Sequence, residues 1–223
     1  MRATASVRSL PLTPPSVRLP EGLGAVRRLQ RGEPLLTQGM PAPGLFVVRS
    51  GLLFESSDSP EGRWLLHDLL APGDLSGTLP PDRCSATVRA AGPAQVRMLD
   101  PWCLDELFAR RPALGIALLR ALQRRADDAG RRVCELTWYA VPQRVILRLL
   151  DLARRHGRPV PGGVRIEITV TQEQLAAMVG AARETVNRAL VRLIAEGLVR
   201  LEGRRFVIMD AATGALPWSV LAP

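Results

Sequence analysis

Four polar side chains that suit the reading of DNA bases occur within six residues of one another. They are Arg183, Glu184, Asn187 and Arg188. An arginine offers two parallel donors to guanine, a glutamate accepts from the amino group of cytosine, and an asparagine pairs with adenine. On one helix these residues would share the first turn and a half, so we expect a helix N-terminus that enters the major groove of double-stranded DNA. The alternative is a solvated helix face with an ordinary arginine–glutamate surface pair.

Three further residues are candidates for contacts to DNA phosphates. Thr171 and Thr185 carry hydroxyl groups beside the predicted base-reading surface, and Arg204 lies where a hairpin is expected to turn. Hydroxyl and guanidinium groups in such places commonly fix a protein on the DNA backbone without reading its sequence.

The residues around these side chains predict two short helices joined by a turn. Thr171 is placed to cap a helix over 172–178, with Gln174 as its capping-box partner. Gly180 suits the left-handed conformation of the turn, and a second helix is expected over 183–196. The apolar positions expected to face inward are Leu175, Ala176, Val179, Val186, Ala189, Leu190, Leu193 and Ile194. With a hairpin turning at 202–204, the pattern predicts a winged helix-turn-helix.

A long helix is predicted before this module, starting after Pro112. Its apolar residues alternate at steps of three and four, which is typical of a helix that packs against another helix. The stripe consists of Leu119, Leu122, Ala126, Ala129, Val133 and Leu136. We expect this stripe to form the seam of a homodimer; the alternative is packing against its own domain. Pro142 should mark a boundary or hinge.

The N-terminal half has a different pattern. From Gly22 to about Leu99, short apolar runs are separated by glycine and proline, which predicts antiparallel strands of a sandwich or barrel. The segment 58–62 should be a turn between strands that end at Glu55 and start near Arg63. After Pro142 we expect a helix over 144–155, a loop over 157–163 and a strand over 164–170.

These patterns together predict an α+β chain of several segments. The expected segments are a flexible lead-in (1–20), a β-roll sensor domain (21–110), a dimerisation helix and hinge (111–141), a winged helix-turn-helix domain (142–210) and a tail (211–223). A length of 223 residues suits two domains and a connecting element.

The composition of the chain gives only weak information about its binding partner. The net charge of +9 suits a polyanion. However, all 30 basic residues are arginine and Asn187 is the one asparagine, as a G+C-rich genome would give. No apolar run is long enough for a membrane span or a secretory signal, so we expect a cytoplasmic protein. Three widely spaced cysteines favour small apolar packing residues over redox sensing.

The run GAARETVNRALVRLIAEGLV resembles the helix-turn-helix of the cyclic-AMP receptor protein and fumarate-nitrate regulator (CRP/FNR) superfamily, and the resemblance extends over about residues 25–210. It implies a jelly-roll domain like those that bind cyclic nucleotides. It also implies a homodimer whose Arg183, Glu184 and Arg188 read a palindrome with G-T-G-A-like arms. Relatives activate transcription by recruiting RNA polymerase through surface loops, and 157–163 corresponds to one of them. Ala182 stands where the family often has serine, and Asn187 where the cyclic-AMP regulator has glycine.

The predicted effector pocket departs further from the family pattern. The corresponding residues are Gly77, Thr78, Arg83, Cys84 and Ser85. The acid that holds the ribose is replaced by Thr78, the arginine that holds the phosphate by Cys84, and the helix pair that meets adenine by Ala129-Gly130. We therefore expect no cyclic-AMP binding and no cofactor, with an effector-independent regulator or an unidentified effector left open.

Other functions find less support in the sequence. The cysteine cluster of the iron–sulfur relatives is missing, and His67 among leucines is more typical of a packed residue than of a haem ligand. No catalytic grouping indicates an enzyme. A ligand-binding module without DNA activity is the remaining alternative, and the intact Arg183, Glu184 and Arg188 argue against it.

Overall fold

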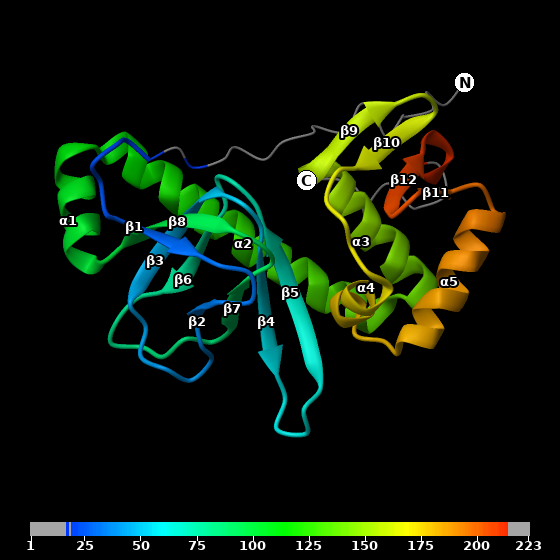
Figure 1. The fold of residues 1–223 in the computed structure, drawn as a ribbon, viewed down its shortest axis with the longest axis horizontal. Helices are drawn as coiled ribbons and strands as arrows, with labels where there is room; N and C mark the ends of the chain where they lie inside the picture. The colour runs from blue at the N-terminus through cyan, green and yellow to red at the C-terminus, as the bar shows by residue number, and fades with distance from the viewer. Residues whose placement is uncertain (1–16, 18, 214–223) are drawn as a thin grey trace. The chain divides into compact units, whose positions relative to one another are not determined.

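The computed structural model describes residue 17 and residues 19–213 of the chain (Figure 1). Most of the predicted lead-in and residues 214–223 of the predicted tail lie outside the described residues. The chain divides into two compact units, and the boundary falls between Arg132 and Val133. Each unit is described by itself.

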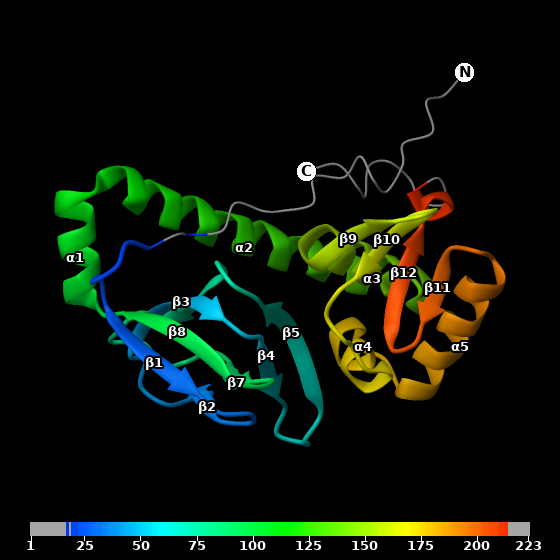
Figure 2. The same ribbon diagram turned by 45° about the horizontal axis from the view of Figure 1, so that its top comes forward.

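The first unit contains the predicted β-roll, built from two four-stranded antiparallel sheets (Figures 1 and 2). One sheet has the order β1 (Ala25–Leu29), β8 (Ala94–Leu99), β3 (Gly44–Ser50) and β6 (Leu75–Thr78). The other has the order β2 (Pro34–Leu36), β7 (Thr87–Ala90), β4 (Leu53–Asp58) and β5 (Trp64–Leu70). Phe46, Val88 and Val96 are among the fully buried residues of the core. The hairpin of β4 and β5 is longer than predicted, because β4 continues past Glu55 to Asp58.

Two helices complete this unit. Helix α1 (Pro101–Arg110), which the sequence patterns did not predict, begins at Asp100, whose carboxylate accepts a hydrogen bond from the Cys103 amide at 2.8 Å. Helix α2 (Pro112–Trp138) is the predicted long helix, and its residues up to Arg132 belong to this unit. Leu118 and Ala121 of α2 join the core formed by α1 and the sheet that contains β3. The first half of α2 is therefore fixed to the roll by apolar packing.

The second unit holds the winged helix-turn-helix. Its elements are α3 (Val141–His156), β9 (Gly157–Val160), β10 (Gly163–Ile166), α4 (Gln172–Val179), α5 (Arg183–Ala195), β11 (Val199–Glu202), β12 (Arg205–Met209) and a short 3-10 helix (Asp210–Thr213). The sheet has the order β11-β12-β10-β9. Pro142 lies in the first turn of α3, whereas the boundary between the two compact units falls earlier, within α2.

Two predictions for this unit were wrong. The expected loop over 157–163 contains the strand β9, and the expected strand over 164–170 ends at Ile166. Pro159 concealed β9 in the sequence, because proline is tolerated in a strand only at a sheet edge, and β9 is an edge strand. Gly162, with φ of +79°, makes the tight turn between β9 and β10.

Two of the three cysteines behave as the predicted apolar packing residues. Cys84 and Cys103 are buried, whereas Cys134 is half-buried. Among the described helices, none is both long enough and apolar enough to cross a membrane.

Candidate DNA-binding surface

The turn between α4 and α5 has the geometry that its sequence predicted. The Thr171 hydroxyl oxygen accepts from the Gln174 amide at 3.1 Å, and the Thr171 amide donates to the Gln174 side chain at 2.9 Å. Gly180 ends α4 in the left-handed conformation, with φ of +61°. Arg144 of α3 donates to the Val179 carbonyl oxygen at 2.7 Å, which satisfies an end carbonyl of α4. No local sequence pattern predicts this last contact, because Arg144 and Val179 are 35 residues apart.

Helix α5 separates its apolar and polar residues clearly. Val186, Ala189, Leu190 and Leu193 are buried. The four predicted base readers, Arg183, Glu184, Asn187 and Arg188, are all exposed in the first turn and a half. Ile194 was predicted to be buried but is 38% exposed, because it lies in the last turn, where the helix leaves the core.

Two of these four side chains are held by hydrogen bonds. Gln172 donates to the Asn187 side-chain oxygen at 3.2 Å, and Arg188 donates to the Thr185 hydroxyl at 3.1 Å. While the first bond is made, the side-chain oxygen of Asn187 is engaged, and its NH2 group is what remains for a base. It would then form one hydrogen bond rather than the pair expected with adenine.

Arg183 and Glu184 present their full hydrogen-bonding capacity. Neither has a side-chain hydrogen bond or ion pair with another part of the chain that the structure describes. Such exposed, uncommitted polar groups at a helix N-terminus are suited to an external partner that presents both donors and acceptors. The base edges of the major groove present both.

The wing is the hairpin of β11 and β12, and it turns at Gly203 and Arg204 as predicted. Most of its arginines are neutralised. Arg205 contacts Glu167 at 2.7 Å and Arg200 contacts Glu202 at 2.5 Å. A hydrogen bond from Arg165 is the main reason that the pKa of Glu167 lies below its ordinary value. Arg204 is exposed at the tip and makes no ion pair within the described residues, so it is the wing residue best placed for a phosphate.

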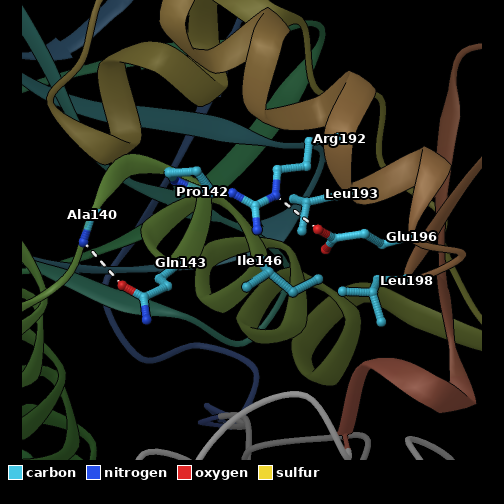
Figure 3. A pocket seen from close by; sticks show the side chains of 8 residues that line it. All are labelled: Ala140, Pro142, Gln143, Ile146, Arg192, Leu193, Glu196 and Leu198. Carbon is cyan, nitrogen blue, oxygen red and sulfur yellow. Dashed lines mark hydrogen bonds and ion pairs between the residues drawn. The ribbon is translucent and has the colours of Figure 1, made fainter.

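A pocket opens between the start of α3 and the C-terminal half of α5 (Figure 3). Its wall consists of Ala140, Pro142, Gln143, Ile146, Arg192, Leu193, Glu196 and Leu198. Arg192 pairs with Glu196 at 2.7 Å across the helix surface, and Gln143 accepts from the Ala140 amide at 3.1 Å. The paired Arg192 and Glu196 lie at the opposite end of α5 from the base readers. We assign the pocket no part in DNA reading.

The residues of the predicted effector pocket lie in different surroundings. Arg83 is turned to the surface and donates to the Gly39 carbonyl oxygen at 2.8 Å, and Cys84 is buried in the roll core. The Ser85 carbonyl oxygen accepts from Ser57 at 3.2 Å. Gly77 is needed for close packing at the end of β6, because a side chain there would lie 2.5 Å from the Gly44 carbonyl oxygen. Thr78 ends β6 and is half-buried.

A cluster of buried charges that the sequence analysis missed lies inside the roll. Glu55 on β4 and Asp68 on β5 are only 7% and 8% exposed. Glu55 accepts a hydrogen bond from Ser76 and pairs with Arg125 of α2 at 2.5 Å. Arg132 of α2 lies 3.5 Å from Asp68. A signal was present, because an acid inside an apolar strand such as LLHDLL needs a buried partner.

His67 lies next to this cluster and is packed, as expected. Its Nε2 is 2.7 Å from the Ser57 hydroxyl oxygen. Burial is the main reason that the pKa of His67 lies below its ordinary value. The charges of Arg132 and Arg125 also lower this pKa, whereas the charges of Glu55 and Asp68 raise it. Among the described residues, no group of three or more acidic, histidine or cysteine side chains could hold a metal ion.

The two units match two known families. Residues 26–111 match the cyclic nucleotide-binding domain, and residues 143–213 match the Crp-like helix-turn-helix domain. A CRP-like cAMP-activated global transcriptional regulator of Mycobacterium tuberculosis is 35% identical over 185 residues, which cover 81% of this chain and 82% of that protein. The transcriptional activator protein anr of Pseudomonas aeruginosa is 26% identical over 187 residues, covering 83% and 77%.

Solved structures have the same fold. FixK2 from Bradyrhizobium japonicum has a TM-score of 0.75 at 20% identity, covering 86% of this chain and 96% of that one. A CRP-family regulator from Thermus thermophilus has a TM-score of 0.69 at 26% identity, covering 85% and 95%. The chain combines a DNA-binding winged helix with a domain of the cyclic nucleotide-binding fold. It belongs to the CRP/FNR superfamily of DNA-binding transcription regulators, which confirms the predicted family and α+β fold.

Proposed function

We propose that this regulator binds a palindromic DNA site as a homodimer, without cyclic AMP, and activates transcription. The observation that carries the DNA-reading part is the exposed N-terminal face of α5, where Arg183 and Glu184 have no side-chain partner among the described residues. Arg183, Glu184 and Arg188 are the proposed readers of a G-T-G-A-like arm, and Asn187 adds one hydrogen bond. Thr171, Thr185 and Arg204 are the proposed phosphate contacts.

The homodimer is supported by an apolar stripe on α2 that is mostly left exposed by the residues that the structure describes. Leu119, Val133 and Leu136 are 55%, 63% and 45% exposed, and Ala126 and Ala129 are exposed beside them. Leu122 is half-buried against the core of the first unit. A long stripe with this spacing is satisfied by the same stripe on a second copy. A two-fold dimer would then present two copies of α5 to two half-sites.

Independence from cyclic AMP is supported by the inside of the roll. The relative from Mycobacterium tuberculosis is named as cAMP-activated. Here Thr78 and Cys84 replace the acid and the arginine of the family pattern, and Ala129 and Gly130 replace the pair that meets adenine. The charges of Glu55, Asp68 and Arg125 are paired with each other or with neighbouring groups.

Activation is proposed because similar proteins are named as activators, including anr. The turn between β9 and β10, at Pro161 and Gly162, is exposed and is the proposed contact to RNA polymerase. The alternative function is a regulator of the same type that needs a small effector other than cyclic AMP.

Selection of bound duplexes from a random DNA pool tests the proposal. The full chain, purified without ligand, should enrich a palindrome with G-T-G-A-like arms. A variant with Arg183 and Arg188 both changed to alanine serves as the control and should enrich none. If the unmodified chain enriches no sequence unless a cell extract of small molecules is added, the effector-dependent alternative replaces the proposal.

A further inference from the structure

The face of α2 that packs on the roll changes from apolar to basic along the helix. Leu118, Arg125 and Arg132 follow one another at intervals of seven residues, so they lie on one side of the helix, two turns apart. Leu118 is buried in the apolar core. Two turns later the same side carries the guanidinium group of Arg125, and two turns further on that of Arg132.

The roll meets these arginines with two acids placed directly opposite each other. Glu55 on β4 and Asp68 on β5 are register partners in the antiparallel pair. Like charges in that position repel, and burial increases the cost of each charge. The arrangement is stable only if cations lie between the two strands and the helix.

Arg125 contacts both acids and so connects the two strands to the helix. Its Nη2 is 2.5 Å from Glu55 Oε2, and its Nη1 is 3.8 Å from Asp68 Oδ2. Arg132 adds a contact of 3.5 Å to Asp68 and a hydrogen bond to the His67 carbonyl oxygen. Ser76 donates to the other oxygen of Glu55. The helix is thus held at two points by directional contacts, where apolar packing alone would let it rotate or slide.

We infer that Arg125 and Arg132 are positioning residues for DNA reading, because they fix the rotation of α2 on the roll in the absence of a ligand. The exposed stripe lies next to them on the helix: Ala129 is about 40° and Ala126 about 100° around the axis from Arg125. Fixing the arginines therefore fixes the direction in which the stripe faces a second copy. This inference rests on the proposed function, and it names the internal charges as the element that replaces an effector.

The test separates position from stability with two variants of the full chain. Arg125→Met removes one partner and leaves Glu55 buried without its cation, which should destabilise the roll. Adding Glu55→Leu removes both charges, and such apolar replacements commonly restore stability. Arg120→Met, at an exposed site on the same helix, is the matched control. DNA affinity for the selected palindrome and the dimer dissociation constant are measured at a temperature where every protein is folded.

Both Arg125→Met and the double variant should bind DNA at least about tenfold more weakly than the unmodified chain, as expected for a coupling between distant sites. Both should also dimerise more weakly, although the double variant has recovered its melting temperature. If Arg125→Met does not fold, the double variant alone decides. Recovery of DNA affinity with stability in the double variant, or unchanged affinity in both, would overturn the inference. If the unmodified chain selects no DNA, the proposed function has failed instead.

Discussion

In the helix-turn-helix, the proposed base readers are exposed, and the side chains of Arg183 and Glu184 make no hydrogen bond or ion pair with the described residues. In the β-roll, Glu55 and Asp68 are buried, and they pair with the half-buried Arg125 and Arg132 of α2. The first region is built to bind something from outside. The second pairs its charges with one another, in a domain that matches the cyclic nucleotide-binding domain. The contrast teaches that one chain can leave polar groups exposed for a partner in one domain and pair them internally in the other.

The largest expected effect breaks the internal pairing. Asp68→Leu removes the carboxylate that contacts both Arg125 and Arg132, so the two arginines lose a partner inside the roll. We therefore expect the free energy of unfolding to fall by about 3 kcal/mol. Glu184→Leu, on the exposed surface of α5, should change it by less than about 0.5 kcal/mol. Urea denaturation followed by circular dichroism measures both. Equal, small changes would show that the roll charges are no more committed than the surface ones.

The next effect concerns a single base pair. Arg183→Ala should lose about 1–3 kcal/mol of binding free energy on the selected palindrome, with the loss confined to one guanine position. Binding to duplexes that differ at one base pair in each arm provides the measurement. A uniform weakening on every duplex would instead identify Arg183 as a phosphate contact.

A smaller effect is expected at the wing. Arg204→Ala should weaken binding to all sequences alike and reduce the slope of log affinity against log salt by about 1 for each chain. Arg200→Ala is the control, because Arg200 already pairs with Glu202. A salt slope that is the same in both variants would remove Arg204 from the DNA surface.

The smallest effect concerns the protonation of His67. Burial holds the pKa of His67 below its ordinary value of 6.5 in the folded chain, so the unfolded chain binds the proton more readily. The stability that this histidine contributes is complete above pH 6.5 and is lost as the pH falls below it. His67→Gln should therefore flatten the decline in unfolding free energy between about pH 7 and about pH 5. A decline as steep as that of the unmodified chain would assign it to other groups.

The sequence was sufficient for features that local rules determine. The cap at Thr171 and Gln174, the left-handed Gly180 and the exposed side of α5 all depend on residues only a few positions apart. The buried charges could not be predicted in the same way, because Glu55 and Arg125 are 70 residues apart in the sequence. Their pairing depends on the register of β4 with β5 and on where α2 crosses the roll. Strand β9 was missed because its glycine and proline resemble a loop until its place at the sheet edge is known.

The most direct test of the account is the affinity of the full chain for its selected palindrome, measured by fluorescence anisotropy with and without saturating cyclic AMP. The account predicts tight, sequence-specific binding in the absence of nucleotide, and an affinity that changes less than about twofold when it is added, since a ligand without differential binding shifts nothing. Specific binding that appears only with cyclic AMP would contradict it.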